Sequence, residues 1–172
     1  MTSNDQIIAD LNENTDILLE ELAGFNHENF KQRPSPNEWS ASEVTEHLLL
    51  IERNVKKALL GKANVTERAY DGKLTVLKPA LAATGNKIQA PEMVVPQSGT
   101  LNRQEMEKEL RVLREEEAAL IATLDMSETC LEFKHPMMGT MTRYEWVYFS
   151  IYHTERHLHQ LRRIAAVINK EA

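Results

Sequence analysis

The chain has 172 residues, of which 42% are hydrophobic and 27% charged, a composition typical of an ordinary globular protein. This length favours one domain, and we expect residues 1–172 to form a single helical-bundle domain. The formal net charge is −6, with 26 acidic residues against 20 basic ones. That balance argues against nonspecific binding to nucleic acid or to an anionic membrane, because both need a net basic surface.

The cellular compartment is suggested by the single cysteine. With Cys130 alone no intrachain disulfide is possible, which favours a reducing environment. The first residues lack the basic region and apolar stretch of a secretory signal. No apolar run approaches the ~20 residues that span a bilayer. We therefore expect a cytoplasmic protein that has no contact with membrane or nucleic acid.

Two helices are predicted in the first third of the chain. Apolar residues at helical spacing predict the first over about residues 5–23 and the second over about residues 39–61. Ser40 and Glu43 form a capping box, in which the hydroxyl accepts a backbone N–H and the carboxylate reaches back to the cap. Gly61 is a natural C-terminal residue.

The middle of the chain is less regular. Residues 62–99 contain several prolines and glycines, and a short helix over 75–83 is limited by Pro79. Connections of this length in a small domain tend to be functional or mobile. A third long helix is predicted over about residues 102–124, where the dense charges indicate a solvated face with internal ion pairs.

A fourth helix is predicted from about residue 142 to 169. Pro136 and Gly139 mark a turn before it, and Thr142 with Glu145 forms a capping box at its start. No alternating apolar and polar run indicates a strand. Four helices of roughly twenty residues therefore predict an all-α fold, a four-helix bundle.

The fourth helix carries the most informative pattern. His153 and His157 are four residues apart, so at about 100° per residue their imidazoles share one face. Gln160 continues the same stripe, whereas Glu155 and His159 fall on the far side. Because a buried imidazole without a partner is costly, a core-facing pair of histidines indicates either hydrogen bonds or a shared metal.

A third histidine, His47, interrupts the apolar stripe of the second helix. Together with His153 and His157 it would give three nitrogen ligands and leave positions open for water or substrate, as in catalytic metal sites. Imidazole suits Zn, Ni, Fe or Cu, so the ligands alone do not select the metal. His27 and His135 are expected in surface loops, although His135 can approach the mouth of the site.

Three segments resemble the DinB superfamily, in particular the branch that includes metal-dependent hydrolases and bacillithiol-transferase-like proteins. They are residues 39–48, 135–146 and 153–160, which contain Trp39 and His47, His135-Pro136, and the His153/His157 pair. Their order and separation are similar to those of the family. The resemblance covers about residues 11–168, and its motifs are specific for the family and not for one reaction.

This resemblance implies an up-down-down-up bundle with a long crossover between its second and third helices. It also implies a divalent metal, commonly zinc or nickel, at one end of the bundle. The family's metal-binding histidines correspond to His47, His153 and His157, and the glutamine that follows the pair corresponds to Gln160. Many members are dimers, so the resemblance also implies a homodimer.

Three functions are compatible with such a site. The first is a hydrolase, in which the metal activates water against a small-molecule substrate and Glu43, or less well Glu46, acts as a base or orients a ligand. The second is an S-transferase that uses a low-molecular-weight thiol resembling bacillithiol, with Arg156 and residues 62–99 binding this cosubstrate. The third is a non-catalytic, stress-associated bundle in which the metal mainly stabilises the fold.

Overall fold

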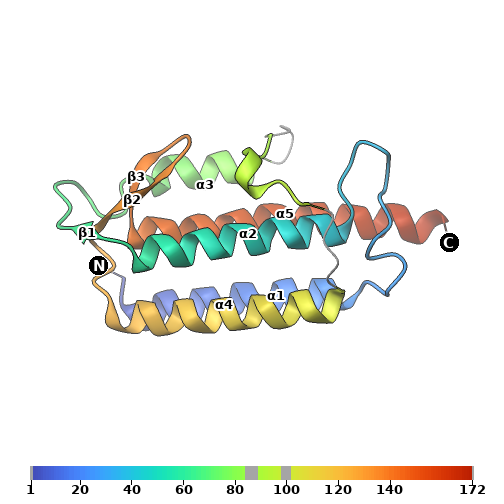
Figure 1. Cartoon of the computed structure of the whole chain (residues 1–172), viewed down its shortest axis with the longest axis horizontal. Coiled ribbons are helices and arrows are strands. Elements are labelled where there is room, and N and C mark those ends of the chain that lie inside the picture. The colour runs from blue at the N-terminus through green and yellow to red at the C-terminus, as the bar shows by residue number, and fades with distance from the viewer. Residues whose placement is uncertain (1, 84–88, 98–101, 172) are drawn as a thin grey trace.

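Four long helices form the body of the molecule. The structure is a computed structural model, and it describes residues 2–83, 89–97 and 102–171. The long helices pack side by side in a bundle (Figure 1), and they are α1 (Asn4–Ala23), α2 (Ala41–Leu60), α4 (Arg103–Thr123) and α5 (Arg143–Glu171). Each lies within one or two residues of the range that the sequence predicts, the usual uncertainty of helix ends.

The direction of the helices decides which of them are neighbours. In Figure 1, α1 and α5 run away from the end of the bundle that carries the N-terminus, and α2 and α4 run back towards it. This is the up-down-down-up order. Both α1 and α2 pack against α4 and α5. The antiparallel pair α2 and α5 therefore faces the elements that connect the long helices.

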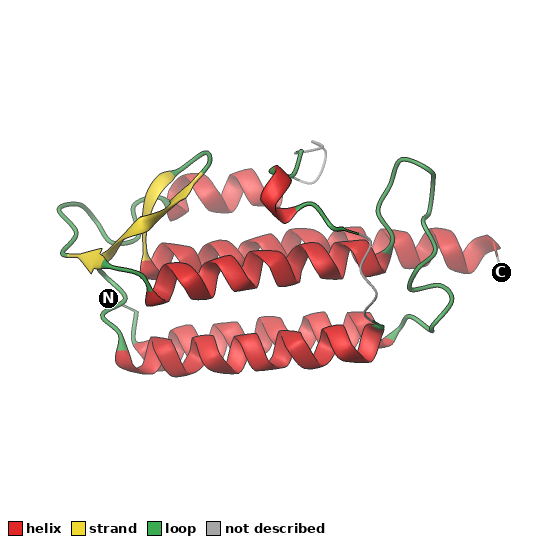
Figure 2. Cartoon of the chain, in the orientation of Figure 1, coloured by secondary structure: helices red, strands yellow, loops and turns green. Residues whose placement is uncertain are grey.

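The fold also contains smaller elements, and the strands among them were not expected from the sequence pattern, so the all-α prediction is wrong in this respect. Figure 2 shows them at one side of the bundle, and they are β1 (Ala63–Asn64), α3 (Leu74–Ala82), the 3-10 helix η1 (Glu92–Val94), β2 (Thr129–His135) and β3 (Gly139–Thr142). The strands form an antiparallel sheet of order β1-β2-β3. β1 has only two residues, too few for an alternating pattern to identify.

We call α3, η1 and the β2–β3 hairpin the cover, because they lie across α2 and α5 (Figure 1). The cover contains the short helix expected over residues 75–83, and α3 accommodates Pro79 in its interior. Leu77 and Leu81 are the buried residues of α3. The described part of the long connection therefore packs on the helices expected to bear the site.

Local capping explains where the helices begin. The Ser40 hydroxyl accepts the Glu43 N–H at 3.2 Å, and the Glu43 carboxylate accepts the Ser40 N–H at 2.9 Å. At the start of α5, Glu145 accepts the Thr142 N–H at 2.9 Å, and the Thr142 hydroxyl accepts the Glu145 N–H at 3.1 Å. Both predicted capping boxes are confirmed. They satisfy backbone donors that a helix start would otherwise leave unpaired.

A cluster of polar side chains crosses the middle of the bundle. Arg114 on α4 donates to Glu52 on α2 at 2.7 Å and to the Thr154 hydroxyl on α5 at 3.0 Å. The Ser150 hydroxyl also donates to Glu52, at 2.7 Å, and Glu117 is fully buried. The expectation that the charged residues of this helix form a solvated face is wrong for Arg114 and Glu117, since both lie in the core.

None of the helices in the described part of the chain combines the length and hydrophobicity needed to span a bilayer.

Candidate metal centre

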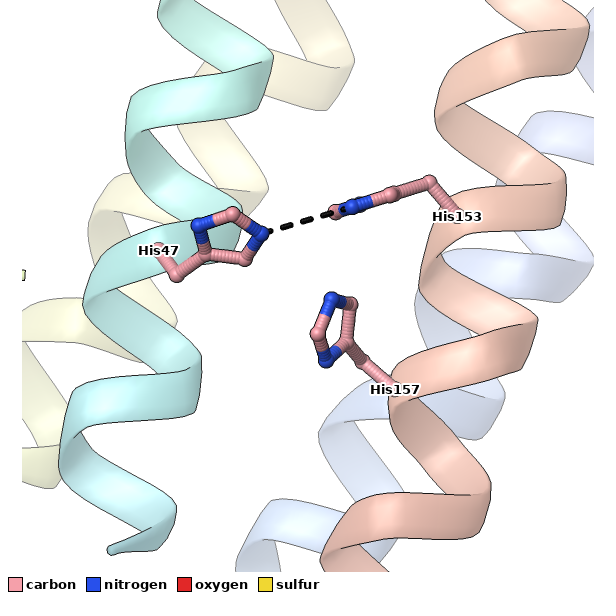
Figure 3. A group of neighbouring side chains, drawn as sticks. All are labelled: His47, His153 and His157. Carbon is pink, nitrogen blue, oxygen red and sulfur yellow. Dashed lines mark hydrogen bonds between the residues drawn. The ribbon is translucent and has the colours of Figure 1, made fainter. Parts of the chain in front are cut away.

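Three histidines from two antiparallel helices meet at one place, as predicted. His47 lies on α2, and His153 and His157 lie one turn apart on α5 (Figure 3). One ring nitrogen from each lies within 4.8 Å of the other two. His47 is 3% exposed and His157 is 8% exposed, whereas His153 is half-buried.

Hydrogen bonds fix the protonation of two of these rings. Nδ1 of His47 lies 2.6 Å from the carbonyl oxygen of Val94, in η1. Nδ1 of His157 lies 2.8 Å from Oε1 of Gln160, one turn further along α5. Because a carbonyl oxygen only accepts, each Nδ1 must carry the proton and donate it. The Nε2 atoms of both neutral rings therefore keep their lone pairs available for a ligand.

The ring of His153 cannot donate a hydrogen bond to the Nε2 lone pairs of both His47 and His157. Nε2 of His153 lies 3.3 Å from Nε2 of His47, the contact drawn in Figure 3. A proton on Nε2 of His153 can be donated to only one of the two lone pairs, that of His47 Nε2 or that of His157 Nε2. Nδ1 of His153 is buried without a hydrogen-bond partner among the described residues. A divalent cation shared by three imidazoles would take up the lone pairs together. The donor set therefore fits a metal, and catalytic zinc sites use three protein ligands of this kind.

The electrostatics of the site keep the rings neutral. Burial lowers the pKa of His47, and the Val94 carbonyl opposes this only in part. Burial, followed by the neighbouring His157 and His47, holds the pKa of His153 well below its usual range. Burial, followed by His47, lowers the pKa of His157 to about 3. Metal ligands must be deprotonated, and these shifts supply that form at neutral pH.

A cavity of about 310 Å³ adjoins the three histidines. Its walls come from α2 and the loop before it, from α5 and from the cover, and they are mainly apolar and aromatic, including Trp39, Ile51, Phe133, Trp146 and Phe149. Among the described residues that line it, none is acidic and none is a cysteine. The shape and chemistry suit a small, largely apolar molecule, which is the usual occupant of such cavities.

Comparison with known proteins identifies the family. The model of the DinB superfamily matches residues 10–161. The chain belongs to the DinB superfamily. It is also 32% identical over 154 residues to a protein of Bacillus subtilis (strain 168) named "Uncharacterized protein YuaE", a match that covers 87% of this chain and 91% of that protein.

The structure does not bring Glu43 to the cavity of this DinB-superfamily protein. The Glu43 side chain completes the cap of α2 and pairs with Arg33. Burial acts to raise the pKa of Glu43, but hydrogen bonds from Arg33 and Ser40 outweigh it and lower the pKa. Glu46 accepts the backbone N–H of Gln97 at 3.0 Å and does not line the cavity either. Both carboxylates serve the local structure around the start of α2.

Arg156 lies on the cavity wall and also ties the cover to α5. Its guanidinium donates to the carbonyl oxygens of Leu81 at 3.2 Å and Ala83 at 2.5 Å, at the C-terminal end of α3. A cation at this end complements the helix dipole. Glu155 and His159 are exposed, as the helical spacing predicts.

Two further histidines of this DinB-superfamily protein lie in different surroundings, one on the surface and one at the cavity. His27 is exposed, as expected. His135 is half-buried and lines the cavity, so the surface expectation is wrong and the expected approach to the site is confirmed. Its ring centroid lies 4.8 Å from that of Phe149 and 6.0 Å from that of Trp146. In the sequence, His135 is followed directly by Pro136, and Gly139 comes three residues after this proline. This pattern marks a tight turn, and it was the sequence feature that could have indicated the position of His135.

Proposed function

We propose that the protein is a cytoplasmic metal-dependent enzyme, active as a homodimer, that holds one divalent cation, zinc or nickel, with His47, His153 and His157. The supporting observation is that three neutral imidazoles, two of them buried and that of His153 half-buried, converge next to an apolar cavity. Three protein ligands leave coordination positions open, which is the arrangement of catalytic rather than structural sites.

The surrounding residues have defined tasks in this proposal. Val94 and Gln160 accept the Nδ1 protons of His47 and His157, which orients both rings and directs their lone pairs to one point. The apolar walls hold the body of the substrate and keep bulk water away from the ligand nitrogens. When bound, a divalent cation would polarise a carbonyl group and lower the pKa of a water or thiol that it coordinates.

The leading reaction is hydrolysis of a small electrophilic substrate. A second candidate is an S-transferase of the bacillithiol-transferase-like type, and one observation favours it. No acidic side chain lies among the described residues of the cavity wall, so a carboxylate base for water is lacking there. Lys134 and Arg156 instead give the wall positive charge, which complements an anionic low-molecular-weight thiol.

Metal content is the first test. Protein purified without an affinity tag should contain about one zinc or nickel ion per chain by mass spectrometry. His153→Ala should lose that metal, whereas His159→Ala should keep it, because His159 is exposed on the same helix. Equal metal contents in the wild-type protein and His153→Ala would overturn the proposal.

Turnover separates the two reactions and the non-catalytic alternative. The metal-loaded protein would be assayed with an activated ester in buffer, and with an aryl halide with and without added cysteine or bacillithiol. Ester cleavage without thiol supports the hydrolase, and thiol-dependent loss of halide supports the transferase. A protein that loses much thermal stability on chelation, with neither activity, supports a metal that only stabilises the fold. Sedimentation equilibrium on the same samples tests the homodimer.

A further inference from the structure

His135 begins the turn between β2 and β3, and that turn fixes the position of its proton. Nδ1 of His135 accepts the backbone N–H groups of Met137 and Met138, each at 3.2 Å. A ring nitrogen that accepts hydrogen bonds carries no proton of its own. The neutral ring must therefore be protonated on Nε2, which makes Nε2–H a hydrogen-bond donor.

The ring is also fixed in orientation by packing. It stands edge-on to Phe149, with an interplanar angle of 73°, and is tilted by 56° against Trp146. Both partners lie on α5, the helix that carries His153 and His157. Because the ring is held on one side by the turn and on another by α5, Nε2–H is oriented before a ligand arrives. Preorganised donors bind with a smaller loss of entropy.

The turn that holds His135 is itself anchored. The ammonium group of Lys73 donates to the carbonyl oxygens of Met138 and Thr140. Gly139 adopts a φ of 65°, a left-handed conformation that other residues rarely take. The β2–β3 pairing closes the turn by matching His135 with Gly139. The turn is thus built to present the His135 side chain in one position.

His135 lines the same cavity as the three candidate metal ligands. Phe149 lies between the two groups, with its ring centroid 5.3 Å from that of His153 and 4.8 Å from that of His135. None of the described residues accepts a hydrogen bond from Nε2 of His135. Burial, followed by the charge of Lys73, lowers the pKa of His135, so the ring stays neutral at neutral pH.

We propose that Nε2–H of His135 binds an acceptor oxygen of the substrate, and that the ligand class is an apolar carbonyl or carboxylate compound. The apolar walls hold the body of such a molecule, and its oxygen lies against His135 at the cavity wall. The inference rests on the proposed function, because it assigns a substrate class to the same site. It also disfavours amine ligands. An amine brings N–H donors and a positive charge to a wall whose polar side chains include the donors of His135, Lys134 and Arg156.

The test uses the full-length, metal-loaded protein and benzoate as the probe, with benzylamine as a matched probe that carries a cation. His135→Phe keeps a ring against Phe149 but removes both nitrogens. We expect its affinity for benzoate, measured by calorimetry, to fall about 10- to 100-fold, the effect of losing a hydrogen bond to a charged group. Its metal content should equal that of the wild-type protein, since His135 is not a ligand.

Two further variants separate the donor from the turn. His135→Gln keeps an N–H donor on a side chain of similar reach and should recover part of the lost affinity. Lys73→Met weakens the anchor of the turn but leaves the imidazole, so it should bind benzoate more tightly than His135→Phe does. A loss in Lys73→Met as large as that in His135→Phe would overturn the inference, because the order of the turn would then explain both.

The tautomer gives a readout that needs neither metal nor ligand. Nitrogen-15 NMR of the labelled metal-free protein should show His135 protonated on Nε2 and unprotonated on Nδ1. The opposite tautomer, equal benzoate affinities of the wild type and His135→Phe, or no benzoate binding by the wild type would each overturn the inference. A wild-type protein without metal would instead overturn the proposed function, while the tautomer and the benzoate comparison would still decide the role of His135.

Discussion

Arg114→Met removes the basic residue that forms an ion pair with the buried carboxylate of Glu52. Arg114 is 2% exposed and Glu52 is fully buried, and their charged atoms lie 2.7 Å apart. Removing one partner of such a pair leaves an uncompensated buried charge, which costs about 3–5 kcal/mol of the free energy of unfolding. At about 2–4 °C per kcal/mol for a chain of this size, the melting temperature should fall by about 6–20 °C.

Urea denaturation and thermal melting, followed by circular dichroism at neutral pH, measure this loss. A chelator keeps metal binding from contributing to the stability of either protein. Arg111→Met is the matched control, because Arg111 is exposed on the same helix and its loss should change the free energy of unfolding by less than about 0.5 kcal/mol. If Arg114→Met were within about 1 kcal/mol of this control, the buried pair would not have the strength assigned to it.

Three other predictions concern protons, metal and the thiol. Burial, followed by the charge of Glu52, raises the pKa of Glu117 well above 4.5, so the folded state holds a proton that the unfolded state releases. Stability should therefore fall by up to about 1.4 kcal/mol per pH unit as the pH rises from about 4.5 towards the folded pKa, and urea denaturation of Glu117→Gln should lack this component. Gln160→Leu removes the acceptor that orients His157, and metal titration should show an affinity about 10- to 100-fold weaker; an unchanged affinity would leave Gln160 without a role. Burial raises the pKa of Cys130 to about 11, so the native thiol should resist iodoacetamide at neutral pH while the urea-unfolded protein reacts, and equal rates would contradict its burial.

The long helices could be predicted because their signals are local. Helical periodicity and capping pairs such as Ser40–Glu43 and Thr142–Glu145 need only neighbouring residues. The sheet could not be predicted, because β1 is two residues long and pairs with a strand that begins at Thr129. Its formation depends on the helices bringing distant segments together, which no local pattern records.

The same distinction applies to burial on α4. Its charged residues suggested a solvated face, yet Arg114 and Glu117 are in the core. Arg114 is buried where it donates hydrogen bonds to Glu52 of α2 and Thr154 of α5 across the bundle. The sequence of one helix does not show which residues of other helices will lie beside its charged side chains. A charged residue that is buried by such partners is therefore predicted to lie on the surface.

The candidate site was predictable to the same limited extent. The spacing of His153, His157 and Gln160 places three side chains on one face of a helix, and the structure brings His47 to the same face. Val94 could not be identified as the acceptor for His47, because η1 is separated from α2 by a long connection. Residues that belong to the cover become visible only when the cover is folded onto the bundle.

This division between bundle and cover has a functional consequence. The bundle supplies the three candidate ligands, all from α2 and α5, whereas the cover supplies the acceptor on Val94, the donor on His135 and part of the apolar wall. Changes to the cavity side of the cover should therefore alter which molecule binds without removing the metal. Changes to the facing surfaces of α2 and α5 should remove the metal whatever the ligand. A bundle with one metal site can in this way serve different substrates through changes in its connecting segments, where binding residues are commonly found.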